Sequence, residues 1–304
     1  MNVVRLANRS RRRARRLLVA AIVAGVGLSQ PQAARREPPV ASAQAPREGA
    51  VELLGVRLHY VDTGGGGTPV VLLHAATGSS RVWEYQLPAF TRAGYRVIAY
   101  DRRGYGSTVV GTDGPLGTAA DDLDALASHL KLDRFHLVGT AAGGIVATDY
   151  ALSFHARLRS LVIANSLVGV SDEDYLALGR RLRPKEFNLL PPDLRELGPA
   201  YRAASPAGTD RWLSLERASR APGTPPPSQP SKNIVTFQAL QALAVPTLLV
   251  TGGADLYTPP PLLELFARRI RGSETLVLHD AGHSAYWEQP DAFNEAVLGF
   301  LKRH

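Results

Sequence analysis

The chain contains no cysteine and only one methionine among its 304 residues. Without cysteine it can form no disulfide, no lipid-modified cysteine and no cysteine-based metal site. Aromatic residues are also few, at 7%, while 45% of residues are hydrophobic and 20% are charged. This ordinary globular composition excludes a disordered chain, a collagen and a protein with several membrane spans. At this length, one large domain can bury a sizeable core without a covalent staple.

The excess of positive charge is confined to the N-terminal segment. Residues 1–47 contain ten arginines and one glutamate, a net charge of +9, whereas the whole chain carries +8. Residues 48–304 therefore hold 25 basic and 26 acidic side chains. A nucleic-acid-binding protein should carry its basic surface on the folded domain, so the charge distribution argues against a nucleic-acid partner.

Residues 1–45 have the layout of a secretory signal peptide. A basic stretch precedes an uncharged run at residues 17–28, and small residues suited to cleavage follow at Ala41 and Ala43. A helix of this run would be about 18 Å long, against about 30 Å of bilayer hydrocarbon, so we expect no stable membrane span. We therefore expect a periplasmic or secreted protein whose mature chain begins between residues 34 and 46. The alternatives are an uncleaved anchor and a misassigned start.

From residue 51 onward, short apolar runs alternate with glycines and helical stretches. Eight strands are predicted, at residues 51–54, 57–61, 70–73, 97–100, 135–138, 161–164, 247–250 and 275–278. The first two should form a hairpin around Gly55. The later runs are typical of parallel strands that helices cover on both faces, and periodic stretches such as residues 119–130 predict those helices. We therefore expect an α/β fold with an eight-stranded, mostly parallel sheet.

A helical insertion is expected between the last strands. About eighty residues separate the strands predicted at 161–164 and 247–250, far more than a crossover needs. Its amphipathic first part predicts short helices that form a cap rather than a surface loop, and five prolines in residues 222–230 predict an extended strap. The expected domains are a leader over 1–45, a core over 46–166, the cap and strap over 167–232, and the remaining core over 233–304.

Five motifs follow predicted strands, at the carboxyl ends where open parallel sheets bind their ligands. They are HAATG at residues 74–78, DRRGYGS at 101–107, GTAAGG at 139–144, GGAD at 252–255 with Pro259, and Gly282-His283 followed by Glu288 and Pro290. With these motifs in this order, residues 51–165 and 245–302 resemble the α/β-hydrolase fold family. The resemblance implies a sharp strand-to-helix turn at residues 139–144, which needs small residues beside its tip.

The residue at the tip of that turn is Ala141. In the family that the chain resembles, this position normally holds a serine nucleophile. Alanine has no lone pair with which to attack, so no acyl-enzyme can form here. Thr140 lies one residue before the tip, so its side chain should point to a different side of the turn from that of residue 141. Hydroxyls near the expected pocket mouth are interpreted as turn or cap groups; they belong to Ser79, Ser80, Ser107 and Ser284.

The other two members of a catalytic triad are present. The resemblance assigns the acid to Asp255 and the base to His283. A carboxylate that orients one imidazole nitrogen leaves the other basic, so the pair could deprotonate a water or an acidic substrate without a serine. Taken singly, Asp255 could instead cap a helix and His283 could be a turn residue. The expected oxyanion donors are the backbone N–H groups of Ala142 and of Ala75 or Ala76.

These observations predict an exported hydrolase or lyase that acts on a small, rather apolar ester, lactone or other carbonyl compound. No metal is expected, because His279 and His283 lack an acidic partner at ligand spacing. No cofactor is expected either, because residues 139–144 lack both the G-x-G-x-x-G pattern of a nucleotide-binding turn and a lysine. The aromatic side chains expected to bind substrate under the cap are those of Trp83, Tyr175, Trp212 and Tyr286. Two alternatives remain, a binding protein without catalysis and a serine hydrolase changed from Ser to Ala at position 141.

Overall fold

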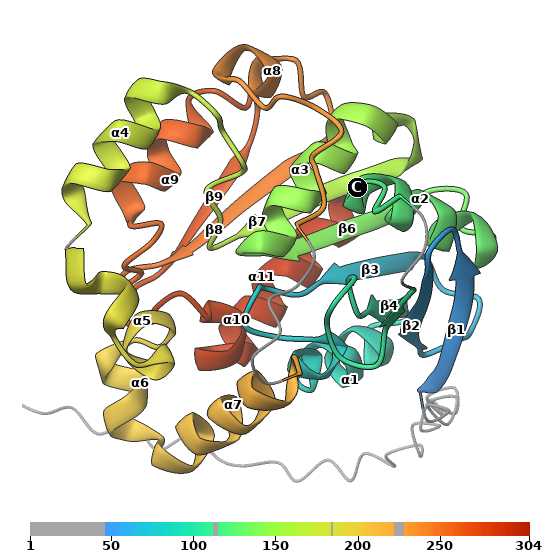
Figure 1. Ribbon diagram of the computed structural model, residues 1–304, viewed down its shortest axis with the longest axis horizontal. Helices are drawn as coiled ribbons and strands as arrows, with labels where there is room; N and C mark the ends of the chain where they lie inside the picture. Colours follow the sequence, from blue (N-terminus) through green and yellow to red (C-terminus); the bar gives the residue numbers. More distant parts are fainter. Residues whose placement is uncertain (1–45, 112–114, 184, 222–227) are drawn as a thin grey trace, which may run out of the picture. The chain divides into compact units, whose positions relative to one another are not determined.

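A computed structural model describes residues 46–111, 115–183, 185–221 and 228–304. The predicted leader lies outside these residues, and so do residues 222–227 of the predicted strap. Helices cover both faces of a central sheet (Figure 1). No helix in the described part of the chain combines the length and the hydropathy needed to cross a membrane.

The sheet runs in the spatial order β1-β2-β4-β3-β6-β7-β8-β9, and β5 pairs with β2. Its strands are β1 (Arg47–Leu53), β2 (Val56–Asp62), β3 (Pro69–Leu73), β4 (Arg96–Tyr100), β5 (Val109–Val110), β6 (Phe135–Thr140), β7 (Leu158–Ala164), β8 (Thr247–Gly252) and β9 (Glu274–Leu278). Pairing is antiparallel around β2 and parallel from β4 to β9. The predicted α/β fold with a mostly parallel sheet is confirmed. The strand β5 was not among the eight predicted strands, because its two residues are too few to show a periodicity.

The apolar side chains of the strands alternate between two core clusters. Val70 and Leu72 of β3 belong to one cluster, whereas Val71 and Leu73 belong to the other. The first cluster packs against α1 (Gln86–Arg92), α10 (Ala285–Glu288) and α11 (Pro290–Arg303); the second packs against α2 (Ala119–His129), α3 (Ala142–Phe154) and α9 (Pro260–Ala267). This double covering explains why the predicted parallel strands are apolar throughout.

The residues between β7 and β8 form short helices. They are α4 (Glu173–Leu182), α5 (Pro192–Glu196), α6 (Pro199–Ala204), α7 (Pro206–Ala218), α8 (Phe237–Gln241) and the 3-10 turn at Lys185–Leu189. Trp212 and Leu215 of α7 are buried in the cluster that also contains α10 and α11. The insertion is therefore attached to the sheet by apolar packing. The domain boundaries at residues 166 and 232 remain a prediction.

Candidate active site

The turn from β6 into α3 is sharp and strained. Ala141, at its tip, has φ 49° and ψ −116°, a conformation that costs a non-glycine residue roughly 1–3 kcal/mol. A Cβ on Gly139 would lie 2.4 Å from the carbonyl oxygen of Gly143, and one on Gly143 would lie 2.2 Å from that of Leu73. Both positions therefore require glycine. The turn places Ala141 on the wall of a cavity that also contains His283.

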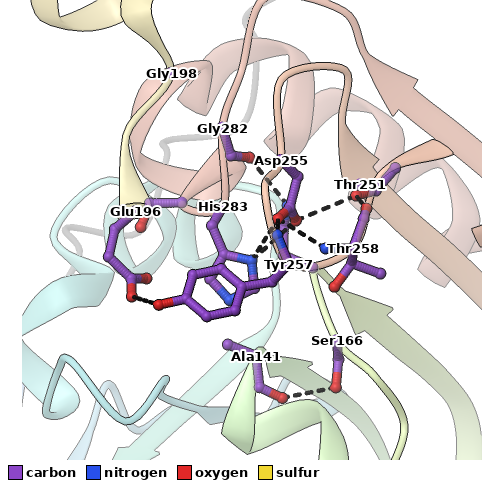
Figure 2. Close-up of polar contacts among 12 residues, drawn as sticks. Ala141, Ser166, Glu196, Gly198, Thr251, Asp255, Tyr257, Thr258, Gly282 and His283 are labelled. Carbon is purple, nitrogen blue, oxygen red and sulfur yellow. Dashed lines mark hydrogen bonds and ion pairs between the residues drawn. The ribbon is translucent and has the colours of Figure 1, made fainter. Parts of the chain in front are cut away.

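His283 and Asp255 are in direct contact (Figure 2). Asp255 lies in the turn after β8, and His283 lies between β9 and α10. Nδ1 of His283 is 2.9 Å from each carboxylate oxygen of Asp255. This contact favours the tautomer with its proton on Nδ1, so Nε2 is the basic nitrogen. The structure thus brings together the two residues that the sequence predicted as base and acid.

Backbone and side-chain donors hold the Asp255 carboxylate in place. Its Oδ1 accepts the N–H groups of Tyr257 at 2.7 Å and Thr258 at 2.9 Å. Its Oδ2 accepts a hydrogen bond from Nδ2 of Asn165 at 3.0 Å. The hydroxyl of Thr251 also donates to Oδ2, at 3.3 Å. A carboxylate with this many donors has one stable orientation, which in turn fixes the imidazole.

The contact between Asp255 and His283 favours the charged form of each side chain, whereas burial favours the neutral form. Burial favours the neutral acid, but attraction to His283 and its hydrogen bond hold the pKa of Asp255 below its ordinary value of 3.8. Burial also opposes a charged imidazole, but Asp255 raises the pKa of His283 above 6.5, with smaller contributions from Glu196 and Glu288. His283 therefore holds a proton more strongly than a free imidazole does, as a proton acceptor should.

A cavity of about 330 Å³ opens at His283. Ala75 and Ala76 line it after β3, and Ala141 and Ala142 line it at the turn into α3. The first N–H groups of a helix have no partner within it, so the N–H of Ala142 is suited to bind a negative oxygen. The structure therefore brings the predicted oxyanion segments to one cavity with His283.

Buried polar contacts fix the loop that carries Ala75. Nδ1 of His74 donates to the carbonyl oxygen of Ala75 at 2.7 Å, and its Nε2 accepts the N–H of Arg102 at 3.1 Å. Burial, together with the charge of Arg102, lowers the pKa of His74 to about 3. His74 is therefore neutral and has both nitrogens occupied, which suits a structural role and not that of a base.

Five polar residues that line the cavity belong to no sequence motif and were not predicted: Asn165, Arg195, Glu196, Arg220 and Tyr257. The Tyr257 hydroxyl donates to Oε1 of Glu196 at 3.1 Å, and the Tyr257 ring lies against His283 with the ring centroids 4.2 Å apart. Glu196 is only 5% exposed, and burial raises its pKa. A carboxyl group of the insertion is thus brought close to His283, a placement that depends on how the insertion folds.

Glu288 joins the histidine loop to the insertion. Its carboxylate accepts the backbone N–H groups of Gly282 at 2.9 Å, Ser284 at 3.2 Å and Gly198 at 2.7 Å. Burial raises the pKa of Glu288 to about 7, although these hydrogen bonds act in the opposite direction. The carbonyl oxygen of Glu196 also accepts the N–H of Ser284 at 2.9 Å. The loop that carries His283 and the link between α5 and α6 are therefore one hydrogen-bonded unit.

The four aromatic residues predicted to bind substrate do not line this cavity. Trp83, Trp212 and Tyr286 are at most 2% exposed and lie in the core cluster beside α7 and α10. Tyr175 packs against Phe266 and lines a neighbouring cavity of about 430 Å³. Large rings gain most free energy where they are fully buried, and a sequence pattern does not separate such places from a pocket wall.

The other hydroxyl groups considered from the sequence also lie away from the cavity wall. Thr140 is fully buried behind the tip of the turn. Ser79, Ser80 and Ser284 are buried at loop or helix starts, and Ser107 lies beside β2 in a separate depression. Within the described ranges, no three histidine, aspartate or glutamate side chains gather closely enough to hold a metal ion.

The fold and this constellation define the class of protein. The family model described as α/β hydrolase fold matches residues 68–290, so the chain belongs to the α/β hydrolase fold family.

Its relatives include enzymes of several kinds. A 2-hydroxy-6-oxononadienedioate/2-hydroxy-6-oxononatrienedioate hydrolase of Klebsiella pneumoniae is 28% identical over 268 residues, which cover 82% of this chain and 92% of the relative. The solved structure of a bromoperoxidase from Bacillus anthracis has a TM-score of 0.66 and 26% identity, covering 85% of this chain and 100% of that one. The structure of an N-acyl homoserine lactone degrading enzyme also has a TM-score of 0.66 and 26% identity, covering 83% and 100%.

Proposed function

We propose that this protein is an exported enzyme that hydrolyses a small ester, lactone or related carbonyl compound, or cleaves a bond next to its carbonyl group. His283 is the base, Asp255 orients it, and no residue forms a covalent intermediate. The observation that carries the proposal is the contact of 2.9 Å between Nδ1 of His283 and both oxygens of Asp255, on the wall of the cavity at Ala141.

The proposed reaction uses water in place of a serine hydroxyl. Nε2 of His283 takes a proton from a water molecule as its oxygen attacks the carbonyl carbon. The carbonyl oxygen becomes negative and accepts hydrogen bonds from the N–H of Ala142 and of Ala75 or Ala76. The protonated imidazole then gives its proton to the leaving group as the bond to the carbonyl carbon breaks. Asp255 stabilises the imidazolium between these steps.

The relatives support the broad substrate class. The Klebsiella enzyme and the lactone-degrading enzyme are named for substrates that contain a carbonyl group. The small methyl group of Ala141 leaves room beside His283 where a serine hydroxyl would otherwise stand. A water molecule at that place would lie between the base and the oxyanion donors.

Export is proposed from the leader alone. Residues 17–28 are uncharged and follow a basic stretch, and the net charge of +9 in residues 1–47 contrasts with the balanced remainder. Expression in a bacterial host, cell fractionation and intact mass should show a periplasmic or secreted product that begins between residues 34 and 46. A full-length product that stays with the cytosol would refute export.

The proposed activity can be tested with a panel of small esters and lactones on the purified protein. The wild type should hydrolyse at least one of them, and His283→Ala should reduce kcat by at least 100-fold, as expected for loss of a general base (about 10²–10⁴-fold). His279→Ala is the matched control, because His279 is exposed on the loop just before the base. A fluorophosphonate probe should not label the wild type.

Three results would refute the proposal. Turnover that survives His283→Ala would remove the base. Probe labelling that disappears when a different serine is mutated would reveal another nucleophile. Saturable ligand binding that is unchanged by His283→Ala, without turnover of any compound, would identify a binding protein that has lost catalysis.

A further inference from the structure

A second cavity, of about 430 Å³, lies between α4 and α9. Figure 1 shows these two helices next to each other, and the rings of Tyr175 on α4 and Phe266 on α9 are in contact, with centroids 5.9 Å apart. Leucine and proline make up most of the wall of this α4–α9 cavity, namely Leu167, Leu256, Pro259, Pro261, Leu262 and Leu265. No acidic side chain of the described residues lines it. Such a wall favours an apolar ligand.

The two arginines on the wall have partners of their own. Arg268 is exposed and pairs with Glu264 at 3.8 Å. The guanidinium of Arg183 lies 5.9 Å from the centre of the Phe187 ring and 5.6 Å from that of Tyr257, which places its charge over aromatic faces. The surface that the α4–α9 cavity leaves for a ligand is therefore apolar.

Two wall residues leave room and apolar surface for a ligand. Leu256 is 52% exposed, although it directly follows Asp255 in the chain. Gly179 lies inside α4, where glycine is among the least favourable residues. A Cβ at Gly179 would meet no atom of a neighbouring described element within 4 Å, so no close contact requires glycine there. The missing side chain widens the cavity.

The α4–α9 cavity adjoins the reaction cavity. Leu167 and Tyr257 line both. The Tyr257 ring lies against that of His283, with centroids 4.2 Å apart, and its hydroxyl is held by Glu196 at 3.1 Å. A group bound in the α4–α9 cavity beside Tyr257 is therefore about one side chain away from His283, so one ligand can occupy both cavities.

We propose that the α4–α9 cavity binds an alkyl chain of the substrate, whose carbonyl group lies beside His283. The identity of the chain as part of a substrate rests on the proposed function. An alkyl chain needs no hydrogen-bond partner, whereas a polar group would lose its hydration against leucine and proline without replacing it. The substrate is then an ester or lactone with a medium-length alkyl chain, and Tyr175 contacts that chain.

The first test measures binding of alcohols that have no carbonyl group. Isothermal titration calorimetry compares 1-octanol with 1-butanol on the full chain, in the wild type and in His283→Ala. Octanol should bind at least about thirtyfold more tightly, because each buried methylene group contributes about fourfold to the affinity. His283→Ala should not change this ratio. Equal affinities for the two alcohols, or no binding of octanol, would overturn the alkyl site.

The second test fills the cavity. Gly179→Leu should weaken octanol binding by about tenfold or more, since the added side chain takes the place of several methylene groups. Its unfolding temperature should be equal to or above that of the wild type, because leucine is the better helix former. Gly299→Leu is the matched control, because Gly299 is an exposed glycine inside α11. Unchanged octanol affinity in Gly179→Leu would contradict the proposal.

A polar wall variant provides evidence that does not depend on the folding of α4. Leu256→Asn should weaken octanol binding by about fivefold or more, since it replaces apolar wall with an amide. Leu189→Asn is the control, because Leu189 is an exposed leucine of the insertion outside the cavity. An equal loss of affinity in both variants would mean that octanol adsorbs to exposed leucines, and would refute a defined site.

Turnover then separates this inference from the proposed function. For the p-nitrophenyl esters, the ratio of kcat/KM for octanoate to that for acetate should fall by about tenfold or more in Gly179→Leu, and should not change in Gly299→Leu. Octanol binding without turnover of any ester or lactone would refute the proposed function and leave the alkyl site standing. Turnover that depends on His283 but not on chain length would refute the alkyl site and leave the proposed function standing.

Discussion

Ala141 has a strained backbone conformation at the tip of the turn between β6 and α3, and its side chain is a methyl group. Its φ of 49° and the glycines at positions 139 and 143 leave residue 141 on the cavity wall. The contact between Asp255 and His283 is also present. At this scale, the sequence predicted which side chains meet because each follows a parallel strand whose carboxyl end lies at the same edge of the sheet.

Introducing a hydroxyl at position 141 should allow covalent chemistry at the proposed site. Ala141→Ser adds one oxygen to a residue already in the required conformation, next to a base that is already oriented. We expect stoichiometric labelling by a fluorophosphonate probe, detected by intact mass. The double variant Ala141→Ser/His283→Ala should not be labelled. Absence of labelling in the single variant would show that Nε2 of His283 does not reach position 141.

The activity of the wild type should depend on the protonation of His283. Only the neutral imidazole accepts a proton, and Asp255 raises the pKa of His283 above 6.5. The value of kcat/KM should therefore rise with pH and level off above this raised pKa. Asp255→Asn removes the charge that raises the pKa, so the residual activity should begin to rise at lower pH. If kcat/KM of Asp255→Asn rises over the same pH range as that of the wild type, this acidic limb of the profile does not report the protonation of His283.

At the scale of secondary structure, apolar runs revealed the strands, but the walls of the cavity remained hidden. Compact apolar runs such as residues 70–73 and 247–250 are typical of strands in a sheet that helices cover on both faces. Glu196 and Tyr257 reach the base because of the way α5 packs near the loop after β8. No local pattern encodes such packing. The same limit explains why Trp83 and Tyr286 were expected in the pocket but lie in the core.

Glu288 holds the loop of His283, and its removal should affect catalysis more than folding. Glu288→Gln replaces an acceptor oxygen with an amide donor that faces backbone N–H groups, so the loop of His283 should shift. We expect kcat to fall by at least about tenfold with little change in KM. Loss of the Glu288 charge should also lower the pKa of the acidic limb.

The matched control is Glu264→Gln, because Glu264 is an exposed carboxylate on α9 that pairs with Arg268. It should leave kcat and the pH profile unchanged. A normal kcat in Glu288→Gln would show that the loop of His283 does not depend on this carboxylate.

At the scale of the whole described fold, one core cluster serves both the sheet and the insertion. Trp212 of α7 is buried in the same cluster as Trp83, Tyr286 and Phe293. These buried aromatic side chains therefore hold α7 of the insertion against α10 and α11. The position of the insertion over the site depends on apolar burial, together with the polar contacts of Glu196 and Glu288.

Truncation of Trp212 should loosen this attachment. Trp212→Ala should lower the free energy of unfolding by about 3–5 kcal/mol, the usual cost of removing a large buried aromatic side chain. Urea unfolding followed by circular dichroism measures this change. Leu189→Ala is the control within the insertion, because Leu189 is 81% exposed and should change stability by less than about 0.5 kcal/mol. A similar effect of both variants would contradict a shared core.

The hydrogen bonds between the insertion and the histidine loop have a consequence for the proposed reaction. Lifting α5 and Gly198 from the sheet would break the bonds at Ser284 and Glu288 and remove Tyr257's partner from beside the imidazole. Any opening of this segment that admits a substrate would thus leave His283 without these hydrogen-bonded supports. Entry and proton transfer would then belong to separate conformations, and the base would be competent only after the segment has returned.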